Sequence, residues 1–250
     1  MESAAKTTAL QADIAVVRSV VPPVTCSTWL ALVDAAYRRI EVAQSSDFVA
    51  ESSSFRLRAV AALSVVDVWS AVSSEVRARC VAILGPWLAI DADQCWVRRQ
   101  YDPQSAPPRH RPHSWHQDGA LGYEFAPSGG AAIPDDALLQ MVTCWIALEP
   151  CGVDAPGLEL VTDRVGRMLS PRQLADVAVD RRWPISRRAQ PALEAVDALV
   201  FSGEVLHRTH VSAAMLRSRT SIELRFFRAD AIPVRIDDDE LVAVHGTRAN

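Results

Sequence analysis

Apolar residues recur at two different spacings along this chain. In roughly the first third they return every three or four residues, which is typical of helices that bury one face. This spacing predicts a helix over 27–43, with Ser27 as its N-cap, and two more helices within 55–84. Residues 1–25, rich in Ala and Val, predict only an arm or a short element before the first helix. We therefore expect residues 1–90 to be mostly helical.

After this helical part the pattern changes to that of strands. Short apolar or alternating runs are separated by Gly, Pro and polar residues, and they predict strands at 94–101, 138–148, 157–161, 198–202, 205–209, 220–228 and 234–244. In the longest alternating run, Ile222 and Leu224 share one face, while Ser221, Glu223 and Arg225 share the other. Helices followed by strands favour an α+β, mainly β fold, in which N-terminal helices support a sandwich or barrel. No internal boundary stands out, so we expect one domain over 1–250.

Composition narrows the class of protein. The chain is 49% hydrophobic and 22% charged, with a formal net charge of −4, so no overall positive charge attracts it to nucleic acid or an anionic membrane. The first residues lack the basic start of a signal peptide, and no apolar run is long enough for a spanning helix. We expect a cytoplasmic protein. Its five cysteines show no Cys-x-x-Cys spacing, which indicates free, mostly buried thiols rather than a zinc cluster.

The polar stretch Ser114–Gly119 holds the first residues with a recognisable chemistry. It reads Ser-Trp-His-Gln-Asp-Gly, and in an extended strand His116 and Asp118 point to the same side. One imidazole and one carboxylate on one face are two thirds of a 2-His-1-carboxylate site for non-haem Fe(II). Because short motifs of this kind often arise by chance, the assignment depends on a second histidine from a distant strand. His207, at the start of a predicted strand after a tight turn, is the candidate.

An Arg-x-Ser pair stands on the strand after this histidine. Arg219 and Ser221 are two residues apart and share one face, and an arginine matches a carboxylate with two hydrogen bonds where lysine does not. In order and spacing, the His-x-Asp, distal His and Arg-x-Ser resemble the phytanoyl-CoA dioxygenase (PhyH)-like family of Fe(II)/2-oxoglutarate-dependent oxygenases. The resemblance covers roughly residues 94–228. It includes Cys144–Leu148 and Leu158–Val161, which look like two strands of that family.

The resemblance implies a fold and a set of roles. The fold would be a double-stranded β-helix (jelly roll, cupin-like), with residues 91–250 as the catalytic core. The iron ligands, and hence the catalytic residues, would be His116, Asp118 and His207. Contacts to 2-oxoglutarate would come from five side chains: Arg219, Ser221, Trp145, Thr209 and Arg98. Such a facial triad leaves three positions open, two for the keto acid and one for O2.

Other residues compete for these roles. His210 competes with His207, although in a regular strand its position three residues later turns it to the opposite face. Arg217 shares a face with Arg219. Arg225 shares that face too and could support the ligands, although a solvent-exposed strand arginine is the commoner case.

The segments that flank the motif offer further residues. The Pro-rich loop before it holds two histidines, for which indirect or solvent-facing roles are expected, and two arginines that could reach an anionic substrate: His110, His113, Arg109 and Arg111. A solvated loop is the default for the arginines. Trp115 and Tyr123 flank the triad as pocket walls or as core.

The sequence therefore predicts a mononuclear Fe(II)- and 2-oxoglutarate-dependent dioxygenase. It would hydroxylate, desaturate or cyclise a small-molecule substrate, with release of succinate and CO2. Because halogenases of the family lack the carboxylate ligand, Asp118 favours hydroxylation over halogenation. Two other functions fit part of the pattern: a Zn(II) hydrolase that uses the same two histidines and one aspartate, and a catalytically silent jelly-roll binding protein. A zinc site has no need of the Arg-x-Ser pair, so that pair discriminates against the hydrolase.

Overall fold

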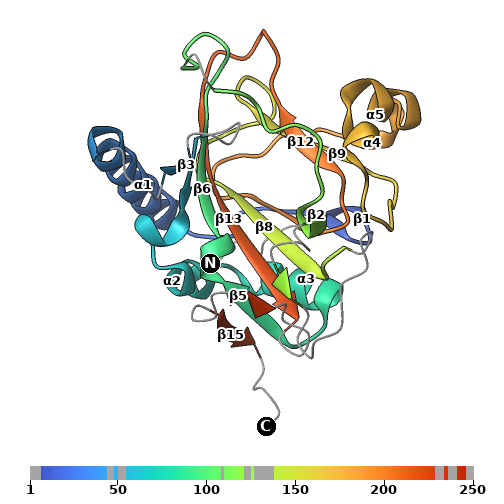
Figure 1. Cartoon of the computed structure of the whole chain (residues 1–250). Coiled ribbons are helices and arrows are strands. Elements are labelled where there is room, and N and C mark those ends of the chain that lie inside the picture. Colours follow the sequence, from blue (N-terminus) through green and yellow to red (C-terminus); the bar gives the residue numbers. More distant parts are fainter. Residues whose placement is uncertain are drawn as a thin grey trace.

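Two antiparallel sheets form the body of the protein and enclose a common interior (Figure 1). The computed structural model describes residues 7–43, 48–49, 55–107, 110–120, 125–126, 138–228, 234–235 and 241–245. Apolar residues from both sheets, among them Trp145 and Phe201 of the larger and Leu160 of the smaller, pack into one cluster between them. The arrangement is the double-stranded β-helix that the sequence predicts.

The larger sheet has ten strands and takes segments from both halves of the chain. Its order is β1-β2-β11-β8-β13-β6-β4-β3, with β5 paired to β13 and to β15. The bounds are β1 Thr7–Gln11, β2 Ile14–Val17, β3 Phe48–Val49, β4 Phe55–Arg58, β5 Leu88–Asp91, β6 Trp96–Gln100, β8 Met141–Ala147, β11 Ala198–Ser202, β13 Arg219–Arg228 and β15 Leu241–His245.

The smaller sheet has three strands in the order β10-β9-β12, and a separate pair joins β7 to β14. The bounds are β9 Gly157–Val161, β10 Arg188–Ala189, β12 His207–His210, β7 Phe125–Ala126 and β14 Val234–Arg235. In β12 against β9, His207 lies opposite Leu160 and Thr209 opposite Leu158. This register turns His207 and Thr209 toward the space between the sheets, because alternate residues share a face.

Three helices cover the outer face of the larger sheet: α1 Pro23–Ala43, α2 Val65–Ala71 and α3 Ser74–Leu84 (Figure 1). Alternate residues of β8 pack against them, with Val142, Cys144 and Ile146 in the same apolar cluster as helix residues. Thr143 and Trp145 therefore point to the interior. The strand is buried on both faces, which explains its near-continuous apolar sequence.

Two short helices, α4 Pro171–Leu174 and α5 Asp176–Arg182, lie outside the smaller sheet (Figure 1). Glu159 of β9 is 2% exposed, and its carboxylate accepts hydrogen bonds from Arg208 at 2.7 Å and Arg188 at 3.4 Å. The Arg208 guanidinium also lies over the Trp115 ring, 4.6 Å from its centroid. Trp115 packs with Val179 of α5 in an apolar cluster of its own, so it belongs to this outer layer rather than to a pocket wall.

The first ninety residues differ in part from what their sequence predicts. Residues 7–17, expected as part of an arm or a short element, form the hairpin of β1 and β2, and β2 pairs with β11 in the larger sheet. Strands β3, β4 and β5 also lie in this part of the chain, so its three helices are interspersed with short strands that the sequence did not predict. Helix α1 begins at Pro23, a residue favoured at the first helical position, and not after Ser27. The Ser27 hydroxyl instead bonds back to the carbonyl of Pro23, 3.1 Å away, within the helix.

Other predictions for the fold are confirmed. Helices α2 and α3 are separated at residues 72–73, and α3 ends at Leu84 before Gly85. Strands β9 and β11 have the expected bounds, and the described residues within the last expected strand, 234–244, belong to β14 and β15. The five cysteines are free and buried. Within the described ranges, no helix is long and apolar enough to span a membrane.

Candidate active site

Backbone pairing brings the His-x-Asp segment beside β12. His116 and His207 exchange main-chain hydrogen bonds, with N···O distances of 2.9 and 3.0 Å. Further along, the Gly119 N–H donates to the Gly203 carbonyl at 2.9 Å. A Cβ on Gly203 would lie 2.5 Å from the Met141 side chain, so a glycine is required for this close approach. The chain thereby fixes two histidines from distant segments next to each other.

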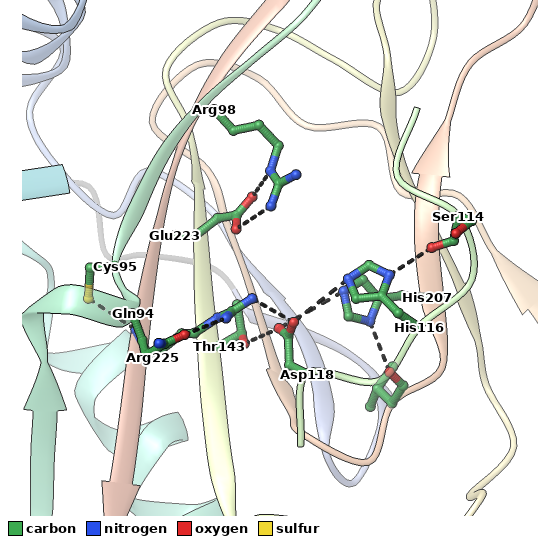
Figure 2. A network of polar contacts seen from close by, with 11 residues as sticks. Gln94, Cys95, Arg98, Ser114, His116, Asp118, Thr143, His207, Glu223 and Arg225 are labelled. Carbon is green, nitrogen blue, oxygen red and sulfur yellow. Dashed lines mark hydrogen bonds and ion pairs between the residues drawn. The ribbon is translucent and has the colours of Figure 1, made fainter. Parts of the chain in front are cut away.

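The side chains of His116, Asp118 and His207 converge in the interior (Figure 2). Each offers a ligand atom, and these atoms all lie within 4.8 Å of one another. The Nε2 atoms of His116 and His207 are 3.7 and 4.0 Å from the Asp118 carboxylate. This is the His-Asp-His cluster that the sequence predicts, and its residues could hold a metal ion.

The second nitrogen of each ring fixes the tautomer. Nδ1 of His116 is 2.8 Å from the Ser114 carbonyl, and Nδ1 of His207 is 2.9 Å from the Val205 carbonyl. A carbonyl oxygen only accepts, so each Nδ1 carries the proton and each Nε2 keeps a free lone pair. An imidazole anchored in this way is the usual form of a metal-binding histidine. The donor set of two Nε2 atoms and one carboxylate therefore fits Fe(II).

The protonation states also suit a cation. Burial, followed by the neighbouring His207, lowers the pKa of His116 to about 3, so the ring is neutral at neutral pH. Burial acts against the charge of Asp118, but Arg225 and the two histidines outweigh it and hold the pKa of this carboxyl well below its ordinary value. A neutral imidazole and an ionised carboxylate are the states in which these groups bind metals.

Arg225 lies beside the cluster rather than on the surface. It is 5% exposed, and its Nη2 donates to Oδ1 of Asp118 at 2.7 Å. The hydroxyl of Thr143 donates to the other oxygen, Oδ2, at 2.5 Å. Thr143 was not identified from the sequence, although its position two residues before Trp145 on a buried strand places both on one face. The expectation of an exposed strand arginine was wrong.

Arg219 lies in the same interior, fully buried. One of its nitrogens, Nη1, donates to the Ser221 hydroxyl at 2.5 Å, and its guanidinium lies 4.8 Å from the centroid of Trp145. Among the described residues, its Nε and Nη2 have no hydrogen-bond partner. Burial lowers the pKa of Arg219 to about 10, which still leaves it charged at neutral pH. A buried cation with two unused donors is a costly arrangement unless an anion binds there.

Arg98 and Thr209 also line this interior. Arg98 forms a two-point ion pair with Glu223, with Nε–Oε1 and Nη2–Oε2 distances of 2.6 and 3.1 Å (Figure 2). The sequence placed Glu223 on the face of Arg225 but gave it no role. The cavity that these side chains line measures about 10 Å³, room for about one water molecule. Entry of a co-substrate therefore requires side chains such as that of Arg98 to move.

Several competing residues lie elsewhere. The side chain of His210 contacts Gln190 at 3.5 Å, and Arg217 pairs with Asp154 on the surface at 2.6 Å. Others occupy the rim of the site or the loop before it. His110 contacts Gln100, His113 packs against His116 with ring centroids 3.7 Å apart and ring planes tilted by 43°, and Arg111 donates to the His110 carbonyl. Arg109 and Tyr123 lie outside the described residues.

A larger cavity, about 670 Å³, is lined in part by Gly203 and Met141. Its lining includes Asp13, Arg164 and Glu204, and none of the side chains of the His-Asp-His cluster. Size alone does not mark the reactive site, because the groups with catalytic potential converge on the smaller cavity.

A double-stranded β-helix whose interior holds a His-Asp-His cluster is typical of non-haem iron oxygenases. The comparison with known families agrees with this class. The family model for phytanoyl-CoA dioxygenase (PhyH) matches residues 14–217, and the chain belongs to that family. It is thus an enzyme of the 2-oxoglutarate-dependent, non-haem iron type. The match includes all three residues of the cluster but ends just before Arg219.

Solved structures show the same fold at low sequence identity. EctD from S. alaskensis with bound Fe has a TM-score of 0.63 at 13% identity, over 89% of this chain and 75% of its own. The non-heme monooxygenase ThoJ has a TM-score of 0.59 at 14% identity, over 92% and 78%. SnoK, a non-heme alpha ketoglutarate dependent carbocyclase from nogalamycin biosynthesis, has a TM-score of 0.55 at 15% identity, over 88% and 81%. No curated protein matches the sequence.

Proposed function

We propose that this protein is an Fe(II)/2-oxoglutarate-dependent dioxygenase that oxidises a C–H bond of a small molecule, with release of succinate and CO2. The observation that carries the proposal is Arg219, a fully buried cation whose Nε and Nη2 lack partners among the described residues. It lines the same cavity as the His-Asp-His cluster. A dicarboxylate that binds a metal at one end needs such a cation at the other.

His116, Asp118 and His207 would hold the iron, which when bound supplies the O2 chemistry that couples decarboxylation of 2-oxoglutarate to substrate oxidation. The protein orients the two histidines by hydrogen bonds from their Nδ1 atoms to main-chain carbonyls, and Asp118 by hydrogen bonds from Arg225 and Thr143. With the proton on Nδ1, the Nε2 atom of each ring presents its lone pair as the ligand.

The co-substrate would be held at its far end. Arg219 would bind the distal carboxylate through its unused donors, and the Ser221 hydroxyl, already bonded to Nη1, would turn the guanidinium toward it. Trp145 under the guanidinium and Thr209 on the facing strand would exclude water from this ion pair. Arg98 would contact the co-substrate only after it turns away from Glu223.

Asp118 narrows the type of reaction. A carboxylate ligand fills the position in which halogenases of the family bind chloride, so hydroxylation, or a related desaturation or cyclisation, is favoured. Neighbours of the same fold are named as a monooxygenase, a carbocyclase and an epimerase, which supports a small organic molecule as substrate. We also propose that the chain is one domain, since the larger sheet combines strands from both halves.

The test is spectroscopic and needs no substrate. Fe(II) and 2-oxoglutarate are added without oxygen, and the visible charge-transfer absorbance of the chelate is recorded. We expect the absorbance in the wild type, its loss in His116→Ala, and a much higher 2-oxoglutarate requirement in Arg219→Ala. Arg217→Ala removes a surface arginine only two residues earlier in the chain and serves as the matched control.

Two outcomes would contradict the proposal. No absorbance in the wild type would leave a hydrolytic zinc site or a silent binding protein as the better explanation. Equal 2-oxoglutarate affinity in Arg219→Ala and Arg217→Ala would show that the buried arginine does not bind the co-substrate. Formation of succinate, measured with O2 present, separates a working enzyme from a protein that only binds the co-substrate.

A further inference from the structure

Both oxygens of the Asp118 carboxylate already have donors in this structure. Arg225 Nη2 lies 2.7 Å from Oδ1, and Thr143 Oγ1 lies 2.5 Å from Oδ2 (Figure 2). All three side chains are buried, with exposed fractions between 2% and 5%. Charge-assisted bonds in a dry interior are stronger than those at a surface.

The two donors are themselves fixed. Arg225 and Thr143 are directly opposite each other in the pairing of β13 with β8, so both project from neighbouring points of one rigid sheet. The other terminal nitrogen of Arg225, Nη1, donates to Gln94 Oε1 at 3.3 Å. Its main-chain N–H donates to Cys95 Sγ at 3.4 Å. Asp118 arrives from the other side of the interior, on the segment that pairs with β12.

We propose that Arg225 and Thr143 form a two-donor cradle that positions Asp118 as a single-oxygen metal ligand. A metal that binds either oxygen of Asp118 leaves the hydrogen bond to the other oxygen in place. Binding through both oxygens would require Arg225 and Thr143 to move away from the carboxylate. Single-oxygen binding keeps coordination positions open for the co-substrate and O2. The inference rests on the proposed function, and it assigns Arg225 a positioning role rather than a catalytic one.

The cradle also compensates charge. Among the described residues, Arg98, Arg219, Asp118 and Glu223 line the cavity, and the buried Arg225 contacts Asp118. Arg98 pairs with Glu223 and Arg225 pairs with Asp118. Arg225 therefore lets the metal ligand stay ionised in a buried place without using the cation that the co-substrate needs.

The test measures metal affinity rather than turnover. Co(II), whose visible absorption changes on coordination by protein ligands, is titrated without oxygen into the wild type, Arg225→Met, Arg225→Lys and Thr143→Val. Arg217→Met, which removes a surface ion pair with Asp154, is the matched control. Loss of a residue that orients a metal ligand typically weakens binding about 10- to 100-fold. We expect this for Arg225→Met, a smaller loss for Thr143→Val, partial recovery in Arg225→Lys and no change in the control.

A second measurement leaves Arg225 in place, in case its replacement prevents folding. In Asp118→Gly the cradle should bind formate, so formate should restore Co(II) binding, whereas neutral formamide should not. Adding Thr143→Val to that variant should weaken the rescue. The Co(II) spectrum of the rescued protein should match that of the wild type, a result that a merely structural ion pair does not produce.

The outcomes separate this inference from the function on which it rests. If the wild type binds no Co(II), the metal site and the cradle fail together. If the wild type binds Co(II) but folded Arg225→Met binds it equally well, the cradle is refuted while the proposed function stands. Failure of formate to restore binding in Asp118→Gly also refutes the cradle.

Discussion

Replacing Arg219 by Met should make the ligand-free protein more stable and abolish its response to 2-oxoglutarate. The reason is that the folded state holds a cation without a counter-anion. Burial lowers the pKa of Arg219 from 12.5 to about 10, which at 1.4 kcal/mol per pH unit costs the folded state ~3 kcal/mol. Met fills similar space but loses the hydrogen bond to Ser221, worth about 1 kcal/mol. The expected net gain is about 2 kcal/mol.

The sign of this effect does not depend on pH in the usual range. A lowered pKa on a basic group is a cost of folding that is fully present below the folded pKa. Since that pKa is about 10, the guanidinium is protonated in both folded and unfolded states from about pH 6 to 8.5. The stability difference between Arg219→Met and the wild type should stay constant over that window.

The assay is thermal unfolding with and without 2-oxoglutarate, with Mn(II) as a redox-inert metal. A gain of about 2 kcal/mol should raise the Tm by roughly 4–8 °C in a chain of this size. The wild type should gain ~2.7 kcal/mol at a 2-oxoglutarate concentration of 100 times its Kd, and Arg219→Met should gain none. The reasoning is refuted if ligand-free Arg219→Met melts below the wild type, or if it keeps the wild-type response to 2-oxoglutarate.

Four further predictions follow from other parts of the fold. Burial raises the pKa of the Cys80 thiol to about 12, so iodoacetamide at about pH 8 should modify it only after unfolding, as followed by mass spectrometry. Glu159→Gln removes the carboxylate that binds two arginines and should cost about 2 kcal/mol in a urea titration, since one of those arginines is partly exposed. Gly203→Ala places a Cβ 2.5 Å from Met141 Cγ and should destabilise the protein by about 1–3 kcal/mol, with weaker Co(II) binding. A serine hydroxyl and two backbone N–H groups hold the pKa of Asp102 below its usual 3.8, so Asp102→Asn should be less stable at neutral pH, and the deficit in thermal unfolding should shrink as pH falls below that value.

Each of these has a result that would count against it. Fast modification of Cys80 in the folded protein would mean that the thiol is accessible. For Glu159→Gln, a urea midpoint equal to that of the wild type would show that the buried carboxylate contributes no net stability. Unchanged stability of Gly203→Ala would show that Met141 yields without cost. For Asp102→Asn, a stability deficit that does not change with pH would exclude the linkage argument.

The sequence predicted the elements whose pattern is local. Strands β9, β11 and β13 were expected within one residue of their bounds, because their residues are continuously apolar or alternate strictly. The hairpin of β1 and β2 was missed, because its short Ala- and Val-rich runs become strands only by pairing with β11, far along the chain. The start of α1 was misplaced because Ser27 resembles a cap. Pro23 instead begins the helix, since a proline has no N–H that would lack a partner in the first turn.

In the candidate site, too, some features could be predicted from the sequence and others only from the structure. His116, Asp118, His207 and Arg219 could be selected from order and spacing, and the structure brings them into one interior. Periodicity also placed Arg225 on the correct face, but a face does not reveal burial. The contact of Arg225 with Asp118 and the ion pair of Glu223 with Arg98 depend on which strands lie opposite each other. No pattern within a single strand encodes this.

The reciprocal hydrogen bonds between His116 and His207 have a consequence for how the protein folds. They join residues 91 positions apart in the chain, and closing so long a segment costs chain entropy before any contact repays it. Contacts of such high sequence separation form slowly. The two imidazoles therefore become neighbours only when the strands between them are in place. Metal uptake during refolding should thus lag behind secondary structure and report the moment at which the topology is complete.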